Sequence, residues 1–161
     1  MRGDVLNLIV GIGEYAVSNN ENDSIKTFAL ASCVAVTAYY PKRKVAGMAH
    51  IALPSPNLAG EDTTRPCYYA STAVPLLINK ICLDFGCPKD ELEINFFGGA
   101  KSIRNDDVFE IGEKNINAVK NALNCLNLKY RAAEIGGTYS RTLEMDVATG
   151  KIKMILQPIT I

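Results

Sequence analysis

The side chains best suited to covalent chemistry are a cysteine and the only histidine in the chain. Cys33 lies in Ala-Ser-Cys-Val, and His50 follows seventeen residues later in Met-Ala-His-Ile. A thiolate is a strong nucleophile, and a neighbouring imidazole can lower the pKa of the thiol and later protonate a leaving group. A third group usually orients the imidazole, and Thr27 is a candidate beside Ser32 and Thr37. These residues predict nucleophilic catalysis, provided that the fold brings them together.

The residues between the cysteine and the histidine favour a β-hairpin. Runs of β-branched, aromatic and small apolar residues span 34–40 and 45–51, and Pro-Lys-Arg-Lys between them is typical of a turn. If the last residue of the first run pairs with the first residue of the second, His50 lies opposite Ala35 and diagonal to Cys33. Diagonal neighbours on one face lie about 7 to 8 Å apart. A slip of one residue would separate the two side chains, so the prediction depends on this register.

Two glycine-containing segments imitate phosphate-binding motifs without completing them. Gly-x-Gly-x-x-Ala at 11–16 follows an apolar run, but no Asp or Glu occurs from Ser24 to Gly60, where a dinucleotide site would place its ribose-binding acid. Gly-Gly-Ala-Lys-Ser at 98–102 has alanine where a P-loop has glycine before the lysine. Both segments are interpreted as tight turns rather than nucleotide sites.

Length and composition indicate a single domain spanning residues 1–161. The chain is 48% hydrophobic and 21% charged, which suffices for a substantial core. Its 17 basic and 17 acidic side chains balance, which argues against nonspecific binding to nucleic acid. No apolar run approaches the ~20 residues of a membrane span, and the first residues lack the apolar region of a signal peptide. We therefore expect a cytoplasmic protein without membrane insertion.

The five cysteines are expected to be free thiols, because their number is odd and the chain shows no secretory context. Cys82 and Cys87 could in principle bind zinc together with Cys67 and Cys125, but the spacing of the four is loose. We predict neither a metal nor a cofactor.

Periodicity predicts an α+β fold. Apolar stripes at helical spacing indicate helices over about 74–85 and 116–126, and Pro75 fits the first of them only in its first turn. Alternation in 143–147 and 152–156 around Ala-Thr-Gly indicates a hairpin. Strands at both ends of the chain with helices between them are typical of this class. The remaining predicted strands span 5–10, 25–30, 34–40, 45–53, 91–97 and 129–135.

Short motifs in a fixed order carry a family resemblance. They are Gly-Ile-Gly-Glu-Tyr-Ala at 11–16, Thr27 before Ser-Cys-Val at 32–34, Gly-Met-Ala-His at 47–50, Tyr-Ala at 69–70 opening a helix, Gly-Gly-Ala at 98–100, Ile-Gly-Glu-Lys-Asn at 111–115, and Gly-Gly at 136–137 before Arg141. In this order and spacing, over nearly the whole chain, the sequence resembles the CheD family of chemoreceptor glutamine deamidases.

The resemblance implies a reaction and a role for each site residue. Cys33 would be the nucleophile, His50 the general acid and base, and Thr27 the residue that orients the imidazole. A glutamine side chain of a chemoreceptor helix would be hydrolysed to glutamate through a thioester, with release of ammonia. We expect backbone N–H groups at Ser32 and Cys33 to stabilise the oxyanion.

The resemblance also implies a fold and partners. The fold would be a layered β-sandwich flanked by helices, in the order α/β/β/α, as in the cytotoxic necrotizing factor deamidases. The partners would be chemoreceptor cytoplasmic helices and a CheC-type phosphatase. The residues expected to contact substrate or partner are Gly98, Gly99, Ala100 and Ile103. The polar loop 54–64 is predicted to border the substrate groove, because it closely follows His50.

Two departures from the family pattern motivate a rival function. Ala29 and Ala31 stand where the family usually has glycine, and alanine resists some backbone conformations that glycine permits. Lys101, Ser102 and Ile103 replace the residues that usually follow Gly-Gly-Ala. A noncatalytic adaptor that binds a receptor or a CheC-type phosphatase is therefore one alternative.

Two further alternatives concern the cysteine itself. The first is a cysteine amidase or esterase that acts on small molecules. The second gives Cys33 and His50 only packing roles in the core.

Overall fold

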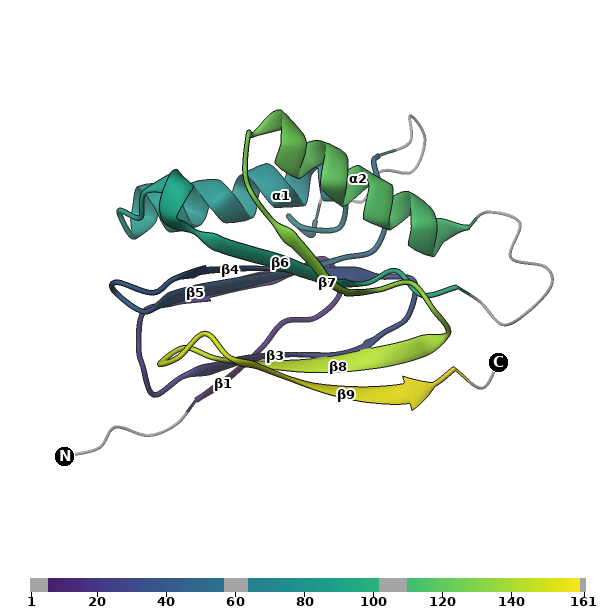
Figure 1. The fold of residues 1–161 in the computed structure, drawn as a ribbon, viewed down its shortest axis with the longest axis horizontal. Helices are drawn as coiled ribbons and strands as arrows, with labels where there is room; N and C mark the ends of the chain where they lie inside the picture. Colours follow the sequence, from purple (N-terminus) through teal and green to yellow (C-terminus); the bar gives the residue numbers. More distant parts are fainter. Residues whose placement is uncertain (1–5, 57–63, 102–109, 160–161) are drawn as a thin grey trace.

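The computed structural model describes residues 6–56, 64–101 and 110–159, which form a two-sheet sandwich with helices on one side (Figure 1). One sheet has the strand order β1-β3-β8-β9, and the other has the order β2-β5-β4-β6-β7. The strands are β1 (Asn7–Ile9), β2 (Tyr15–Ser18), β3 (Ser24–Leu30), β4 (Val34–Tyr40), β5 (Val45–Ile51), β6 (Glu93–Gly98), β7 (Arg131–Ile135), β8 (Tyr139–Asp146) and β9 (Ile152–Pro158). The helices are α1 (Ala70–Asn79), a π-helical turn (Lys80–Asp84), a 3₁₀ turn (Lys89–Glu91) and α2 (Ile111–Cys125).

The burial of each strand explains its hydrophobic pattern. Every residue of β4 and β5 is buried, because helices cover one face of their sheet and the second sheet covers the other. Such strands read as continuous apolar runs. The inward residues of β8 alternate with more exposed ones, because one face of its sheet meets solvent. The β4–β5 hairpin could therefore be predicted from its continuous apolar runs, and the β8–β9 hairpin from its alternating pattern.

The predicted α+β class and layered β-sandwich are confirmed, and the structure refines the order of the layers. Both helices pack on the outer face of the five-stranded sheet, so the described residues form the layers α/β/β (Figure 1). In the described part of the chain, no helix covers the outer face of the four-stranded sheet. Polar residues such as Lys26 and Glu144, which form an ion pair of 3.6 Å, lie on that face. Exposed apolar side chains, Ile9, Phe28 and Ile155, lie beside these polar residues.

The first helix begins at the Tyr-Ala pair of 69–70, where the family resemblance placed a helix start, and earlier than its apolar stripe predicted. It starts at Ala70, so Pro75 lies in the helix interior and the expectation that this proline occupies the first turn was wrong. A proline there removes one intrahelical hydrogen bond. Residues 80–84 continue the helix as a π-turn.

Strand β2, only four residues long, was not predicted, because so short a segment shows little alternation.

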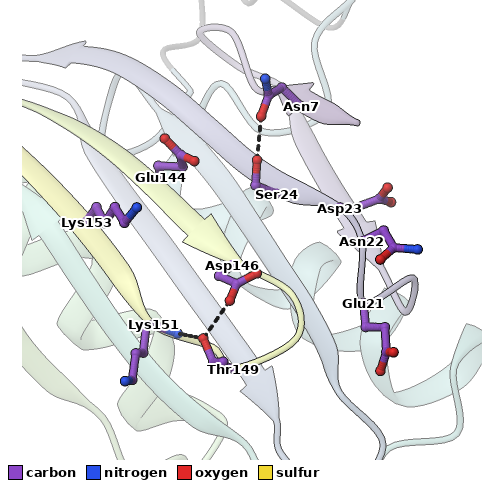
Figure 2. A pocket seen from close by; sticks show the side chains of 10 residues that line it. All are labelled: Asn7, Glu21, Asn22, Asp23, Ser24, Glu144, Asp146, Thr149, Lys151 and Lys153. Carbon is purple, nitrogen blue, oxygen red and sulfur yellow. Dashed lines mark hydrogen bonds between the residues drawn. The ribbon is translucent and has the colours of Figure 1, made fainter. Parts of the chain in front are cut away.

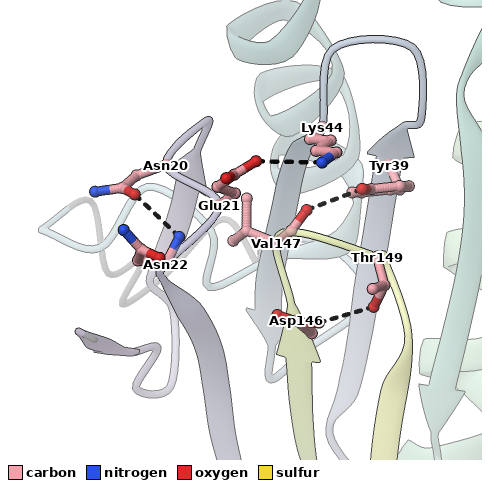
Figure 3. Close-up of polar contacts among 8 residues, drawn as sticks. All are labelled: Asn20, Glu21, Asn22, Tyr39, Lys44, Asp146, Val147 and Thr149. Carbon is pink, nitrogen blue, oxygen red and sulfur yellow. Dashed lines mark hydrogen bonds and ion pairs between the residues drawn. The ribbon is translucent and has the colours of Figure 1, made fainter. Parts of the chain in front are cut away.

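The end of the sandwich at the β4–β5 turn is closed by contacts between loops (Figure 3). The buried hydroxyl of Tyr39 on β4 donates a 2.8 Å hydrogen bond to the carbonyl of Val147 in the β8–β9 turn. Lys44 forms an ion pair of 3.2 Å with Glu21. These contacts connect the two sheets at this end. Cys33 lies at the other end of the sandwich, just before the first residue of β4.

No helix in the described ranges has the length and apolarity needed to cross a membrane.

Candidate active site

The β4–β5 hairpin has the predicted register. Ala35 pairs with His50 at one end of the ladder, and Tyr40 pairs with Val45 at the other. Cys33 is half-buried immediately before β4 and packs against the apolar cluster between the two sheets. Since Cys33 and Ala35 are two positions apart, they share the face that meets the second sheet. The prediction that Cys33 and His50 lie on one face is therefore confirmed.

Thr27 reaches this site from the other sheet. Its Oγ1 lies 2.7 Å from Nδ1 of His50 and also 2.7 Å from the carbonyl oxygen of Val10. The carbonyl can only accept, so the single hydroxyl proton of Thr27 is donated to Val10. The remaining lone pair of Oγ1 then accepts the proton of Nδ1–H. This network assigns the proton of the neutral imidazole to Nδ1 and leaves Nε2 as the acceptor.

The environment of His50 keeps its imidazole neutral. Its side chain is 3% exposed, and burial lowers the pKa of His50 to about 4. Within the described residues, Nε2 has no hydrogen-bond partner. A buried nitrogen without a partner carries a desolvation cost, so Nε2 gains by accepting a hydrogen bond from a group that enters the site.

The thiol is neutral as well. Burial raises the pKa of the Cys33 thiol. The sequence suggested that the imidazole would lower this pKa, but an uncharged imidazole stabilises a thiolate only weakly and desolvation dominates. The resting site therefore contains a thiol and a neutral imidazole rather than an ion pair.

The Gly-Gly-Ala segment after β6 supports the loop that carries Cys33. The Gly99 N–H donates to the Cys33 carbonyl at 2.8 Å, and the Ala100 N–H donates to the Ala31 carbonyl at 2.7 Å. Gly98 has φ +108°, and a Cβ at this position would lie 2.2 Å from the Cys33 carbonyl oxygen. Only glycine allows so close an approach. The segment thus holds the Cys33 loop in place.

Of the four residues predicted to contact substrate or partner, the structure describes three. Gly98, Gly99 and Ala100 are buried against the Cys33 loop. Their role in partner binding stays a prediction. Ile103 lies outside the described residues, and so does most of the loop 54–64.

The two predicted oxyanion residues lie in a loop that continues the β4–β6 pairing. In an antiparallel ladder, the bond from Gly99 N–H to the Cys33 carbonyl would be matched by one from Cys33 N–H to the Gly99 carbonyl. That second bond does not form, and the Cys33 N–H has no partner among the described residues. The Ser32 carbonyl, in the same peptide unit, accepts a hydrogen bond from Asn115.

Ala29 adopts the backbone conformation that a glycine would favour. Its φ is +52°, within the bulge that separates Thr27 from Leu30 in the pairing of β3 with β8. Ala31 is not among the residues with positive φ. The concern raised by the two alanines therefore applies to one of them.

We expect Ala29→Gly to stabilise the protein by about 1 kcal/mol, because glycine removes the steric cost of left-handed backbone. The matched control is Ala31→Gly, which should destabilise by about 0.5 to 1 kcal/mol through added freedom of the unfolded chain. Urea unfolding of the three proteins measures both changes. Equal effects of the two substitutions would show that the bulge carries no strain.

Sequence reasoning missed two buried polar residues near the site. Asn115 is fully buried on α2, and Arg141 is 2% exposed on the inner face of β8. Arg141 donates to the Gly136 carbonyl at 2.6 Å, and the Gly136 N–H donates to the Gly98 carbonyl at 2.9 Å. Both residues occur in the family motifs of the sequence, where neither was given a role. A signal exists for Asn115. It lies in register with the apolar stripe of α2, and a polar residue at such a position is a usable signal.

A groove of about 590 Å³ lies at the opposite end of β3 and β8 (Figure 2). It is lined by side chains of both charges, including Asp23, Asp146 and Lys151. Neither a thiol nor an imidazole lines it. In the part of the chain that the structure describes, no group of three or more His, Cys, Asp or Glu is placed to hold a metal ion. The groups suited to nucleophilic chemistry therefore lie at the Cys33 end.

Relatives of known name match nearly the whole chain. The probable chemoreceptor glutamine deamidase CheD of Syntrophotalea carbinolica is 42% identical over 150 residues, which cover 91% of this chain and 92% of the relative. The chemoreceptor glutamine deamidase CheD of Thermotoga maritima is 38% identical over 144 residues, covering 89% and 88%.

One solved structure and one family model complete the comparison. The crystal structure of Bacillus licheniformis hypothetical protein YfiH matches with a TM-score of 0.50 at 10% sequence identity. The match covers 76% of this chain and 51% of the YfiH chain. At this identity the likeness concerns the fold alone. The family model described as CheD chemotactic sensory transduction matches residues 52–155. With this match and with relatives of 38% to 42% identity, the chain belongs to the CheD family.

Proposed function

We propose that this protein is a chemoreceptor glutamine deamidase that converts glutamine side chains of chemoreceptors to glutamate and releases ammonia. The names of its relatives support this activity. The observation that carries the proposal is the 2.7 Å contact between Thr27 and Nδ1 of His50, which leaves Nε2, unpartnered among the described residues, on the sheet face shared with Cys33. A nucleophile, a base and a group that orients the base are the parts that such a reaction needs.

The first half of the reaction forms a thioester. Sγ of Cys33 attacks the carboxamide carbon while its proton passes to Nε2 of His50. Since thiol and imidazole are both neutral at rest, the proton moves as the new C–S bond forms. The backbone N–H of Cys33 donates to the oxyanion. The C–N bond then breaks, and His50 returns the proton to the leaving nitrogen, which departs as ammonia.

The second half frees the new glutamate side chain of the receptor from Cys33. Water attacks the thioester carbon while Nε2 of His50 takes one of its protons. The C–S bond breaks when the second tetrahedral intermediate collapses, and the leaving sulfur recovers its proton from His50. Throughout both halves, Thr27 keeps Nδ1 protonated and directs Nε2 at the reacting atoms. The receptor side chain is left as a carboxylic acid, which loses its proton to solvent, and the enzyme returns to its neutral pair.

The proposal includes partners and a location. The substrate would be a glutamine on an exposed face of a long cytoplasmic receptor helix, and the protein would act in the cytoplasm. A CheC-type phosphatase would compete with the receptor for the same region. Conversion of a neutral amide to a carboxylate adds one negative charge to the receptor helix, which can shift the balance between its signalling states.

The rival function is that of a noncatalytic adaptor of the same fold. The left-handed backbone of Ala29, three residues before Ser32, favours it, because strain near the nucleophile loop can misplace the thiol. This rival predicts binding to the receptor without chemical change.

Mass spectrometry of chemoreceptor cytoplasmic fragments separates the two functions. The fragments are incubated with the protein and, as a control, with Cys33→Ala. Deamidation adds about 1 Da for each glutamine converted, and peptide analysis locates the site. Conversion by the unmodified protein alone supports the deamidase. A receptor that binds the protein but stays unchanged by it would favour the adaptor.

A further inference from the structure

Asn115 connects the two backbone segments that carry the nucleophile and the base. Its Nδ2 donates to the carbonyl of Ser32 and to the carbonyl of Ala52, both at 2.9 Å. Both partners can only accept, so the orientation of the carboxamide is settled by chemistry. Ser32 precedes Cys33 directly, and Ala52 follows His50 by two residues. One buried side chain thus holds both sides of the site.

The hydrogen bond to Ser32 acts on one particular peptide unit. The carbonyl of Ser32 and the N–H of Cys33 belong to the same planar group and point in opposite directions. A donor that fixes the carbonyl therefore fixes the direction of the N–H. That N–H is the group without a partner among the described residues, and it is the donor assigned to the oxyanion. A bond to the carbonyl also polarises the peptide and strengthens its N–H as a donor.

We propose that Asn115 is a positioning residue that orients the Ser32–Cys33 peptide as the oxyanion donor of the active site. The inference rests on the proposed deamidase function. Asn115 touches neither substrate nor the reacting atoms in this role, and it acts through the backbone. Its second bond, to Ala52, ties the same side chain to the end of β5, which keeps the oxyanion donor in register with His50.

The packing of α2 makes the position of Asn115 rigid. A Cβ on Gly112, one turn earlier, would lie 2.3 Å from the Ala100 carbonyl and 2.5 Å from the Gly99 carbonyl. The first turn of α2 therefore lies directly against the segment that supports the Cys33 loop. Helix, glycine segment and nucleophile loop form one contiguous unit, so a shift of α2 would move the oxyanion donor.

The remaining atom of the carboxamide argues against a purely stabilising role. Asn115 Oδ1 is buried, and the described residues offer it no hydrogen-bond partner. A buried acceptor without a partner carries a desolvation cost. This cost offsets much of what the two donated bonds contribute, since the net contribution of a hydrogen bond is modest. The side chain is better explained by the geometry that it imposes than by stability.

The test compares two reactions of the same thiol. Deamidation passes through an oxyanion, whereas alkylation of Cys33 by iodoacetamide displaces iodide and needs no oxyanion donor. In Asn115→Ala, we expect the kcat for receptor deamidation to fall about 10-fold to 100-fold, with KM little changed. Alkylation of the Cys33 peptide, followed by mass spectrometry, should stay within about twofold of the unmodified protein, because the nucleophile itself is retained.

Controls separate this role from simple loss of structure. Asn117 lies exposed on the same helix, so Asn117→Ala should leave both reactions unchanged. If Asn115→Ala unfolds the protein, Asn115→Ser is a second variant, because its small side chain keeps a hydrogen-bond donor. Circular dichroism verifies that each variant is folded. Equal losses in deamidation and alkylation, or no loss in either, would overturn the inference while the unmodified protein remains active. Lack of deamidation by the unmodified protein would instead overturn the proposed function, and the inference with it.

Discussion

Replacing His50 by asparagine is expected to lower the rate of receptor deamidation by about 100-fold to 10,000-fold, the usual contribution of a general acid and base. The carboxamide nitrogen of asparagine can occupy the place of Nδ1, so the contact with Thr27 is retained. No atom replaces Nε2, so the proton of Cys33 and the proton for ammonia have no carrier. The substitution thus removes the chemistry of the imidazole and keeps its anchoring.

Single-turnover deamidation, followed by mass spectrometry, measures this loss. Urea unfolding of the variant provides the control, because a large loss of stability would show that the Thr27 contact was not kept. A rate within about tenfold of the unmodified protein would contradict the assignment of His50 as acid and base.

The pH dependence of the unmodified protein gives a second measure of His50. The imidazole acts as a base only when it is unprotonated, and burial lowers its pKa to about 4. Activity should therefore persist below pH 6.5, the ordinary value for histidine, and fall as the pH drops through about 4. The acid limb of kcat/KM reports this pKa for the free enzyme. An acid limb near 6.5 would mean that solvent reaches the imidazole.

The register of the β4–β5 hairpin could be predicted because the turn and the two apolar runs leave little freedom. A four-residue turn between strands of equal length pairs Tyr40 with Val45, and this places His50 opposite Ala35. Thr27 was harder to identify as the residue that orients the imidazole, because its contact with His50 joins two sheets. Family resemblance, rather than local pattern, distinguished it from Ser32 and Thr37.

The supporting contacts could not be predicted from local patterns, because they join segments far apart in the chain. Asn115 reaches the Ser32 carbonyl across 83 positions of sequence. The position of α1 also depends on distant residues: its first N–H, at Ala70, donates to the Leu53 carbonyl at 2.9 Å. A hydrophobic stripe marks the buried face of a helix, but its first turn is set by contacts of this kind.

The largest effect on stability is expected from Gly98→Ala. A Cβ at this position would lie 2.2 Å from the Cys33 carbonyl oxygen, which is a backbone atom held by the N–H of Gly99. The φ of +108° adds backbone strain for any residue with a side chain. We expect overpacking and strain together to destabilise the protein by about 3 kcal/mol or more. Any protein that still folds must displace the Cys33 loop, so the rate of deamidation should fall as well.

Gly136→Ala is the matched control for this substitution. Gly136 has φ +72°, and a Cβ there would meet nothing within 4 Å. It therefore isolates the cost of left-handed backbone, about 1 kcal/mol, from the cost of the clash. Urea unfolding and deamidation assays of both variants separate the two terms. If Gly98→Ala were no less stable and no less active than Gly136→Ala, the close approach of β6 to the Cys33 loop would not position Cys33. A greater loss in Gly98→Ala would trace both stability and catalysis to the same point of contact.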